Sequence, residues 1–180
     1  MSSSNVLLLP GWQNSGPHHW QSLWEREYAY TRVDQHEWMR PRRGDWIARL
    51  EEVLLTQTEP AVLVAHSLGC LLVAAWAAHS SNTHRVKGAL LVAPGDSETE
   101  AMRTVLPSWS PIALQPLPFK SVLIGSHNDP YCTLGRAQVL ATAWGSEFVD
   151  YGKSGHINAD SGLGLWAEGQ AILQQLQQVS

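Results

Sequence analysis

The sequence predicts an α/β fold, a three-layer sandwich in which helices cover both faces of a mostly parallel sheet. Short apolar segments of strand length alternate along the chain with longer segments of helical periodicity. The strand-like segments are apolar throughout, and one helix-like segment is apolar nearly all round. With 180 residues, 44% of them apolar, the chain suffices for one well-buried core and is short for two. We expect a single domain over residues 1–180.

Five segments have the length and composition of strands, and a sixth is weaker. The five are residues 6–9, 61–65, 88–92, 121–124 and 148–151, and the weaker one is 30–33. The segment 61–65 (AVLVA) is apolar at every position, which is typical of a parallel strand with helices on both sides.

The segments between the strands have helical patterns. They are residues 20–27, 46–56, 68–79, 134–144 and 165–178. The segment 68–79 is apolar on almost every face and should pack in the middle of the molecule. Residues 94–118 carry five of the ten prolines, which allows one short helix near 98–105 within a loop that could border a substrate pocket.

Ser67 is the first candidate for chemistry, because sites in such folds lie at the carboxyl ends of the strands. It follows an apolar strand and begins the apolar helix, with the small residues Ala65 and Gly69 two positions before and after. This pattern matches a nucleophile elbow, a sharp turn that exposes a serine hydroxyl, with alanine in place of the usual first glycine. The backbone amide of Leu68 would then face a developing oxyanion. The alternative is that Ser67 only caps the helix.

An elbow serine needs an acid and a histidine after later strands, in that order. Asp129 follows the strand predicted at 121–124, and His156 follows the one predicted at 148–151. The sequence therefore predicts a catalytic triad of Ser67, Asp129 and His156, in which the histidine takes the serine proton and the aspartate orients the ring.

Other residues compete for these roles. Asp96 also follows a strand and is the alternative acid, while His127 is a weaker base candidate than His156. His66 cannot easily turn its ring toward the neighbouring hydroxyl, so we expect it to line the pocket or to pack. Cys132, close to the predicted acid, is expected to be exposed, without an arrangement that makes it a nucleophile.

The loop after the first strand should complete the site. In this kind of fold it supplies a second oxyanion amide, which we assign to Trp12, and Gly11 would let the backbone approach the reacting carbonyl. Gln13 and Asn14 follow in the same loop and, with Gly11 and His66, are the predicted substrate-pocket residues. The alternative is a plain turn glycine followed by a core tryptophan.

Composition argues against several classes of partner and cofactor. The chain is mildly acidic, with 16 Asp and Glu against 12 Lys and Arg, which disfavours nucleic acid. No run is long enough to span a membrane, residues 1–10 lack the pattern of a signal peptide, and two cysteines are too few for a disulfide scaffold, so we expect a cytoplasmic protein. The histidines lack metal-ligand spacing, and the glycine-rich residues 162–167 precede no strand, so neither a metal nor another cofactor is expected.

Several short motifs together carry a family resemblance. They are PGW at 10–12, HW at 19–20, DW at 45–46, VAHSLG at 64–69, NDP at 128–130 and GH at 155–156. Over nearly its full length the chain resembles the small α/β-hydrolases of the YdeN-like and retinoblastoma-binding-protein-nine-like serine hydrolase family. The resemblance implies a minimal α/β-hydrolase fold without a large lid, and the same triad. It does not extend to a retinoblastoma-type partner, because the chain has no Leu-x-Cys-x-Glu motif.

Two functions from different classes follow. The first is a serine hydrolase that cleaves a small ester, thioester or amide through an acyl-enzyme intermediate, with no cofactor. The second is a catalytically weak protein-interaction module that retains the hydrolase fold, because nine tryptophans are many for this length and exposed aromatic residues favour interfaces. The sequence makes no prediction of the oligomeric state.

Overall fold

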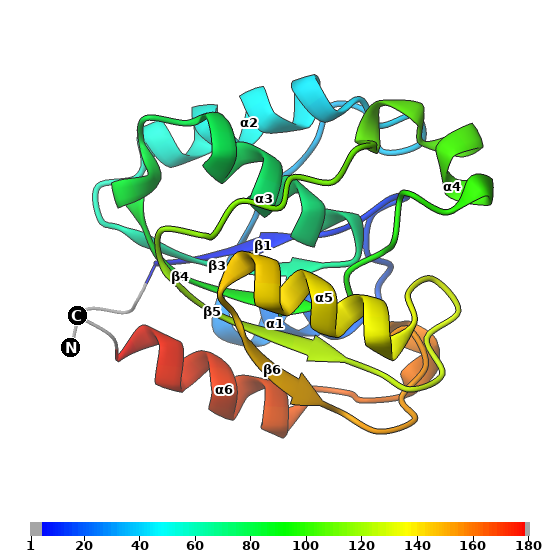
Figure 1. Ribbon diagram of the computed structural model, residues 1–180. Helices are drawn as coiled ribbons and strands as arrows, with labels where there is room; N and C mark the ends of the chain where they lie inside the picture. The colour runs from blue at the N-terminus through cyan, green and yellow to red at the C-terminus, as the bar shows by residue number, and fades with distance from the viewer. Residues whose placement is uncertain (1–4, 179–180) are drawn as a thin grey trace.

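A computed structural model describes residues 5–178 (Figure 1). The ends of the domain predicted at 1–180, residues 1–4 and 179–180, lie outside the described residues. A six-stranded sheet in the order β2-β1-β3-β4-β5-β6, with every neighbouring pair parallel, forms the centre. Its strands are β1 (Asn5–Leu9), β2 (Thr31–Arg32), β3 (Ala61–His66), β4 (Val86–Val92), β5 (Lys120–Gly125) and β6 (Glu147–Asp150). The predicted α/β fold class is confirmed.

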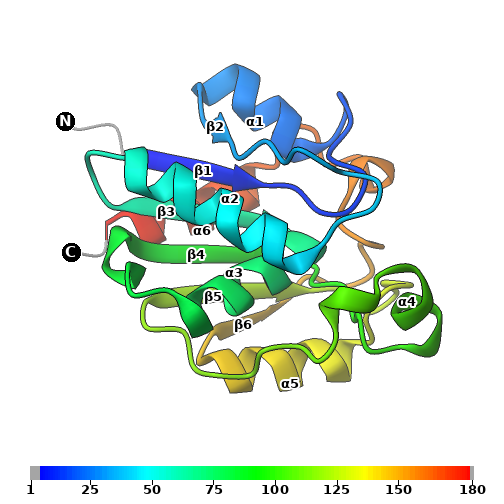
Figure 2. The ribbon, with the colours of Figure 1, turned by 90° about the horizontal axis from the view of Figure 1, so that it is seen from above.

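Helices cover both faces of this sheet (Figures 1 and 2). The α-helices are α1 (Trp20–Tyr28), α2 (Arg43–Thr56), α3 (Leu68–His79), α4 (Glu100–Val105), α5 (Leu134–Trp144) and α6 (Ala167–Gln177). Short 3-10 helices lie at η1 (Thr83–Arg85), η2 (Pro107–Trp109) and η3 (Ala159–Ser161). Helices α2, α3 and α5 lie on one face and α1 and α6 on the other, and α4 lies beyond the carboxyl ends of the strands.

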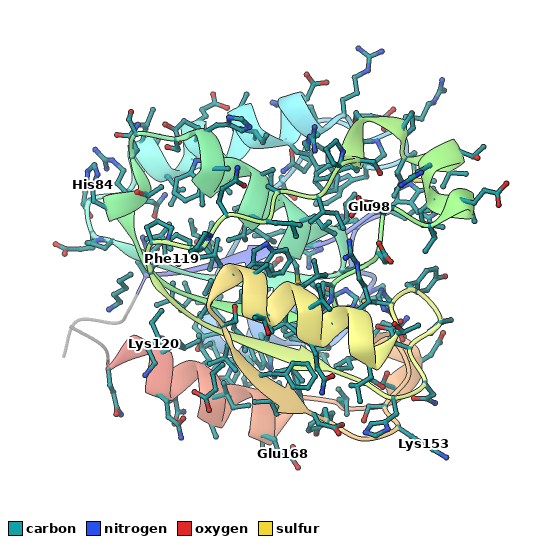
Figure 3. All side chains as sticks on the ribbon, viewed as in Figure 1. His84, Glu98, Phe119, Lys120, Lys153 and Glu168 are labelled. Atoms are coloured by element: carbon teal, nitrogen blue, oxygen red, sulfur yellow. The ribbon has the colours of Figure 1, made fainter. Side chains whose placement is uncertain are left out.

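Alternate residues of each strand belong to two different cores. In β3, Leu63 and Ala65 pack in the core that contains α2, α3 and α5, whereas Val62 and Val64 pack in the core that contains α1 and α6. Every residue of β3 is buried, which explains why the strand is apolar without alternation. Charged side chains such as Lys153 and Glu168 lie on the outer surface (Figure 3).

Element boundaries differ from the predictions at a few ends. The last helix begins at Ala167 instead of 165, because Trp166 adopts a left-handed backbone with φ 46° and its buried indole donates a hydrogen bond to the Tyr151 hydroxyl. Helix α2 begins three residues before its predicted start, at Arg43. The proline-rich loop contains the expected short helix, α4, which begins after Thr99 caps it by accepting from the Met102 amide.

No helix within residues 5–178 combines the length and the apolar character needed to cross a membrane.

The link between β3 and α3 is a single residue, Ser67. It has φ 56° and ψ −119°, a backbone conformation that L-residues rarely adopt. After this turn the first residues of α3 run directly beneath the end of β1. A Cβ atom added at Gly69 would overlap the carbonyl oxygen of Leu9. Only glycine at this position lets the helix approach the strand so closely.

The substitution Gly69→Ala is expected to lower the free energy of unfolding by about 1–3 kcal/mol, because the added methyl group forces α3 away from β1. The matched control is Gly135→Ala in α5, where no atom lies within 4 Å of the added Cβ. This control is expected to leave stability unchanged or to raise it by up to about 1 kcal/mol. Chemical unfolding of both variants measures the difference, and equal stabilities would contradict the close approach.

Candidate active site

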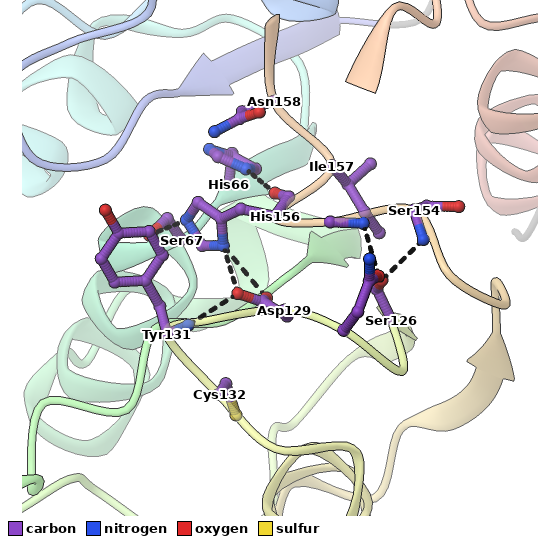
Figure 4. Close-up of polar contacts among 12 residues, drawn as sticks. His66, Ser67, Ser126, Asp129, Tyr131, Cys132, Ser154, His156, Ile157 and Asn158 are labelled. Atoms are coloured by element: carbon purple, nitrogen blue, oxygen red, sulfur yellow. Dashed lines mark hydrogen bonds and ion pairs between the residues drawn. The ribbon is translucent and has the colours of Figure 1, made fainter. Parts of the chain in front are cut away.

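Three loops at the carboxyl edge of the sheet bring the predicted triad together (Figure 4). Ser67 directly follows β3, Asp129 lies in the loop after β5, and His156 lies in the loop after β6. The Nε2 atom of His156 is 2.9 Å from the Ser67 Oγ, and its Nδ1 atom is 2.9 and 3.0 Å from the two carboxylate oxygens of Asp129. Because a carboxylate only accepts, Nδ1 carries the proton and Nε2 is free to accept the serine proton.

The geometry of Ser67 excludes the helix-cap interpretation. Its left-handed backbone is not that of an N-cap residue, and its side chain accepts no hydrogen bond from the amides of α3. The hydroxyl is directed at His156 instead. A side chain at Gly95 would place its Cβ atom 3.3 Å from the same hydroxyl, so this glycine leaves room for the nucleophile. Sequence reasoning missed Gly95, although its position three residues after the end of β4 was a usable signal.

The acid is held by its own loop. The Asp129 carboxylate is 2% exposed and also accepts the backbone amide of Tyr131 at 2.9 Å. The ring of Tyr131 lies against that of His156, with 4.6 Å between centroids. Tyr131 was not predicted, although an amide two residues after an aspartate is a common partner of its side chain.

Side chains from neighbouring loops fix the backbone around His156. The Asn128 side-chain oxygen accepts the Gly155 amide at 2.8 Å, and the Ser126 hydroxyl accepts the Ser154 amide at 2.9 Å. From the opposite side, His66 Nε2 donates to the His156 carbonyl oxygen at 2.8 Å, and the Trp20 indole donates to the next carbonyl, also at 2.8 Å. The histidine is therefore positioned by bonds from both directions.

The competing residues are engaged elsewhere. Asp96 makes no hydrogen bond or ion pair with His156; it accepts the Glu98 amide at 3.1 Å and faces the Arg136 guanidinium at 3.6 Å. His127 pairs with Asp150 at 2.6 Å on the exposed surface. The expectation that Cys132 is exposed is wrong, because it is buried beneath the acid loop. Burial, with nearby carboxylates, raises the pKa of its thiol to about 12, so it is not a nucleophile at neutral pH.

The β1 loop lies against the elbow as predicted. A Cβ atom added at Gly11 would come within 3.0 Å of the His66 carbonyl oxygen and 3.1 Å of the Leu68 nitrogen. Trp12 is half-buried; it packs against the edge of the core that contains α2, α3 and α5, and its indole donates to the Met39 carbonyl oxygen. Its backbone amide has no acceptor among the described residues, whereas the Gln13 amide is bonded to Trp38. Neither the Trp12 amide nor the Leu68 amide has an acceptor among the described residues, so both are free to donate at this edge.

An ion-pair network that the sequence did not reveal supports this loop. Gln13 and Asn14 have φ values of 68° and 65°, a costly conformation for two consecutive non-glycine residues. Arg32 donates to the Asn14 side chain at 2.7 Å and to the Ser15 carbonyl at 3.0 Å. Its guanidinium is paired with Glu25 at 2.6 Å, so the loop is anchored to α1 and β2.

A cavity of about 330 Å³ opens beside Ser67. The four predicted pocket residues all line it, namely Gly11, Gln13, Asn14 and His66. Met102 and Leu106, from the α4 segment, supply an apolar part of the wall, as the proline-rich loop predicted. Among the described lining residues the only charged side chains are Asp96 and Asp160, and neither lysine nor arginine is present.

Three histidine rings lie side by side in the wall. The centroids of His19 and His66 are 4.6 Å apart, and those of His66 and His156 are 4.8 Å apart. Burial, and to a lesser extent the nearby His156 and Arg32, lowers the pKa of His19 from 6.5 to about 3. Burial, then the two adjacent histidines, hold the pKa of His66 well below its ordinary value. His19 and His66 are therefore neutral at neutral pH.

Comparison with known proteins agrees with this geometry. The family model described as serine hydrolase matches residues 6–175. The chain belongs to the serine hydrolase family. The crystal structure of a YdeN-like hydrolase from Pectobacterium atrosepticum is 32% identical with a TM-score of 0.86, and the match covers 98% of this chain and 92% of that one. The predicted family resemblance is confirmed.

More distant structures share the fold of this serine hydrolase. The ydeN gene product of B. subtilis is 20% identical with a TM-score of 0.78, covering 97% of this chain and 98% of that one. A Bacillus cereus carboxylesterase is 17% identical with a TM-score of 0.63, covering 99% and 90% respectively. The comparison with curated proteins gives no match.

The neutral His19 makes the stability of this serine hydrolase depend on pH. In the unfolded chain His19 binds a proton near pH 6.5, whereas in the folded chain it binds one only near pH 3. The contribution of the neutral His19 to the free energy of unfolding is therefore complete above pH 6.5 and decreases as the pH falls below that value. We expect His19 to reduce the free energy of unfolding by about 1.4 kcal/mol per pH unit below 6.5.

The substitution His19→Asn tests this expectation. Asparagine keeps an oxygen that can accept the Gln21 amide, as the His19 ring does at 3.1 Å, but it does not titrate. Chemical unfolding between pH 7 and 4 should show a shallower loss of stability than in the parent. His18→Asn, at the exposed neighbouring histidine, is the matched control and should keep the parent slope. An unchanged slope in His19→Asn would show that burial does not keep this ring neutral.

Proposed function

We propose that this serine hydrolase cleaves small esters, thioesters or amides through an acyl-enzyme intermediate on Ser67, within a single domain. The observation that carries the proposal is the 2.9 Å contact between the Ser67 hydroxyl and His156 Nε2, with the opposite ring nitrogen bonded to a carboxylate that is 2% exposed. The strained turn at Ser67 supports it, because strain of this kind is costly and clusters at functional sites.

The proposed roles follow from the direction of each hydrogen bond. His156 Nε2 takes the proton as the Ser67 oxygen attacks the carbonyl carbon, and Asp129 stabilises the imidazolium that forms. The amides of Leu68 and Trp12 stabilise the oxyanion. His156 then protonates the leaving group, and a water molecule activated by the same nitrogen releases the acyl group. This chemistry requires no cofactor, and the proposed location remains the cytoplasm.

The interaction-module alternative loses its main argument. It rested on exposed aromatic residues, but seven of the nine tryptophans are at most 2% exposed. The exposed apolar side chains, among them Met39, Leu55 and Val139, come from different elements of the chain. No observation on the described surface favours this second function over the first.

The substitution Ser67→Ala is expected to abolish labelling by a fluorophosphonate probe and turnover of short p-nitrophenyl esters. The variant should keep the parent's stability or exceed it, because alanine removes only the hydroxyl. Gel-based labelling and a spectrophotometric esterase assay measure the two activities. Labelling of the alanine variant at the parent level would overturn the proposed nucleophile.

The substitution Asp129→Asn is expected to lower kcat/KM by roughly 10³- to 10⁴-fold, because an amide leaves the ring nitrogen in the wrong tautomer. The matched comparison is Asp96→Asn, for which we expect a loss of less than about tenfold because Asp96 is bonded to Glu98 and Arg136. Steady-state kinetics on one ester decides between the two acids. A larger loss at Asp96 would reverse the assignment.

A further inference from the structure

The Nδ1 atom of His66, a residue of the cavity wall, has no part in the proposed mechanism. His66 precedes the nucleophile, lines the cavity and is 5% exposed. Its Nε2 atom is bonded to the His156 carbonyl oxygen at 2.8 Å (Figure 4). Within residues 5–178, no donor is bonded to its other nitrogen, Nδ1.

The protonation state of His66 Nδ1 follows from the single hydrogen bond at Nε2. A carbonyl oxygen only accepts, so Nε2 of His66 must carry a hydrogen. Burial keeps the ring neutral, because it holds the pKa of His66 well below its ordinary value. A neutral imidazole carries a hydrogen on only one of its two nitrogens, and therefore Nδ1 is an acceptor with a free lone pair.

The adjacent rings leave this acceptor unpaired. The two nitrogens of His156 are bonded to Asp129 and Ser67. His19 accepts the Gln21 amide at its Nδ1, so its hydrogen lies on Nε2, but that atom has no hydrogen-bond partner. The His19 and His66 rings meet edge to face at 69° without a hydrogen bond between them. The Nδ1 atom of His66 is unpaired but not fully enclosed, so a ligand in the cavity that supplies a donor can bond to it.

We propose that His66 determines specificity, with its Nδ1 accepting a hydrogen bond from a hydroxyl or N–H group of the substrate close to the scissile carbonyl. The position follows from the chain, because His66 is adjacent to Ser67 and its ring contacts that of His156. Substrates that carry such a donor are bound and turned over in preference to isosteric ones that lack it. A site that hydrogen-bonds a substrate group discriminates strongly against the analogue without that group. This inference rests on the proposed function.

Two isosteric pairs of esters test the proposal. Methyl glycolate and methyl propionate differ by a hydroxyl on the acyl side, and 2-hydroxyethyl acetate and propyl acetate differ by a hydroxyl on the alcohol side. The measured quantity is the ratio of kcat/KM within each pair, corrected by the ratio of the hydroxide-catalysed rates. We expect the parent to favour the hydroxyl member of at least one pair by about 10- to 100-fold. Corrected ratios near one in both pairs overturn the proposal.

The variant His66→Gln separates recognition from support of the loop. Glutamine can place an N–H near the Nε2 position, where it can still donate to the His156 carbonyl, but it has no acceptor at the Nδ1 position. We expect its corrected ratio to fall to about one for the pair that the parent discriminates. A purely structural role would lower kcat/KM for both members equally and leave the ratio at the parent value, which overturns the proposal. His127→Gln, at an exposed histidine outside the cavity, is the matched control and should keep the parent ratio.

Two further measurements keep the outcomes distinct. If His66→Gln does not fold, as judged by thermal unfolding, His66→Phe provides a ring without nitrogens and should also lose the preference. A parent that is labelled by the fluorophosphonate probe and hydrolyses both members of each pair equally disproves only the role of His66. A parent that is neither labelled nor active on any of the four esters disproves the proposed function, and the role of His66 with it.

Discussion

The single-residue turn at Ser67 is the constraint on which the rest of the site depends. It reverses the chain between a buried strand and an apolar helix, so the hydroxyl projects from the sheet edge instead of capping the helix. Three glycines make room for it, each against a different part of the turn. Gly69 lets the carbonyl oxygen of Leu9 approach α3, and Gly11 lets the β1 loop approach the backbone of residues 66–68. Gly95 leaves space for the Ser67 hydroxyl. The position of the Ser67 hydroxyl therefore depends on β1, β3 and β4 together.

The histidine reaches this serine only because its loop is tied at many points. His156 is 89 residues from Ser67 in the sequence, and its loop contains positive-φ residues at Gly155 and Ile157. Such a loop would sample many conformations in isolation. The bonds from Asn128 and Ser126, and those from His66 and Trp20, remove this freedom. Three separate segments, the loop after β5, β3 and α1, thus pre-orient one ring, which is the arrangement that proton transfer requires.

The sequence predicted the fold and the three side chains that the structure brings together at the candidate site, because both follow local rules. Apolar strands without alternation require a parallel sheet covered on both faces, and a parallel sheet gathers its loop residues at one edge. The Arg32 network and the unpaired nitrogen of His66 could not be predicted in the same way. Both depend on which atoms meet across distant segments, and Arg32 lies in a two-residue strand with weak sequence character. The exposure of Cys132 was wrong for the same reason, because neighbours from other segments cover it.

The row of histidines gives the site one proton acceptor rather than three. His66 lies next to His156, the ring proposed to receive the serine proton, and His19 lies next to His66; a charge on either would repel an imidazolium on His156. Their burial prevents this, because desolvation disfavours the charged form of an imidazole. His156 differs from them in having a carboxylate at its second nitrogen. Of the three rings only His156 has a carboxylate beside it to stabilise a positive charge, and in the proposed mechanism that difference sets the direction of proton transfer from Ser67.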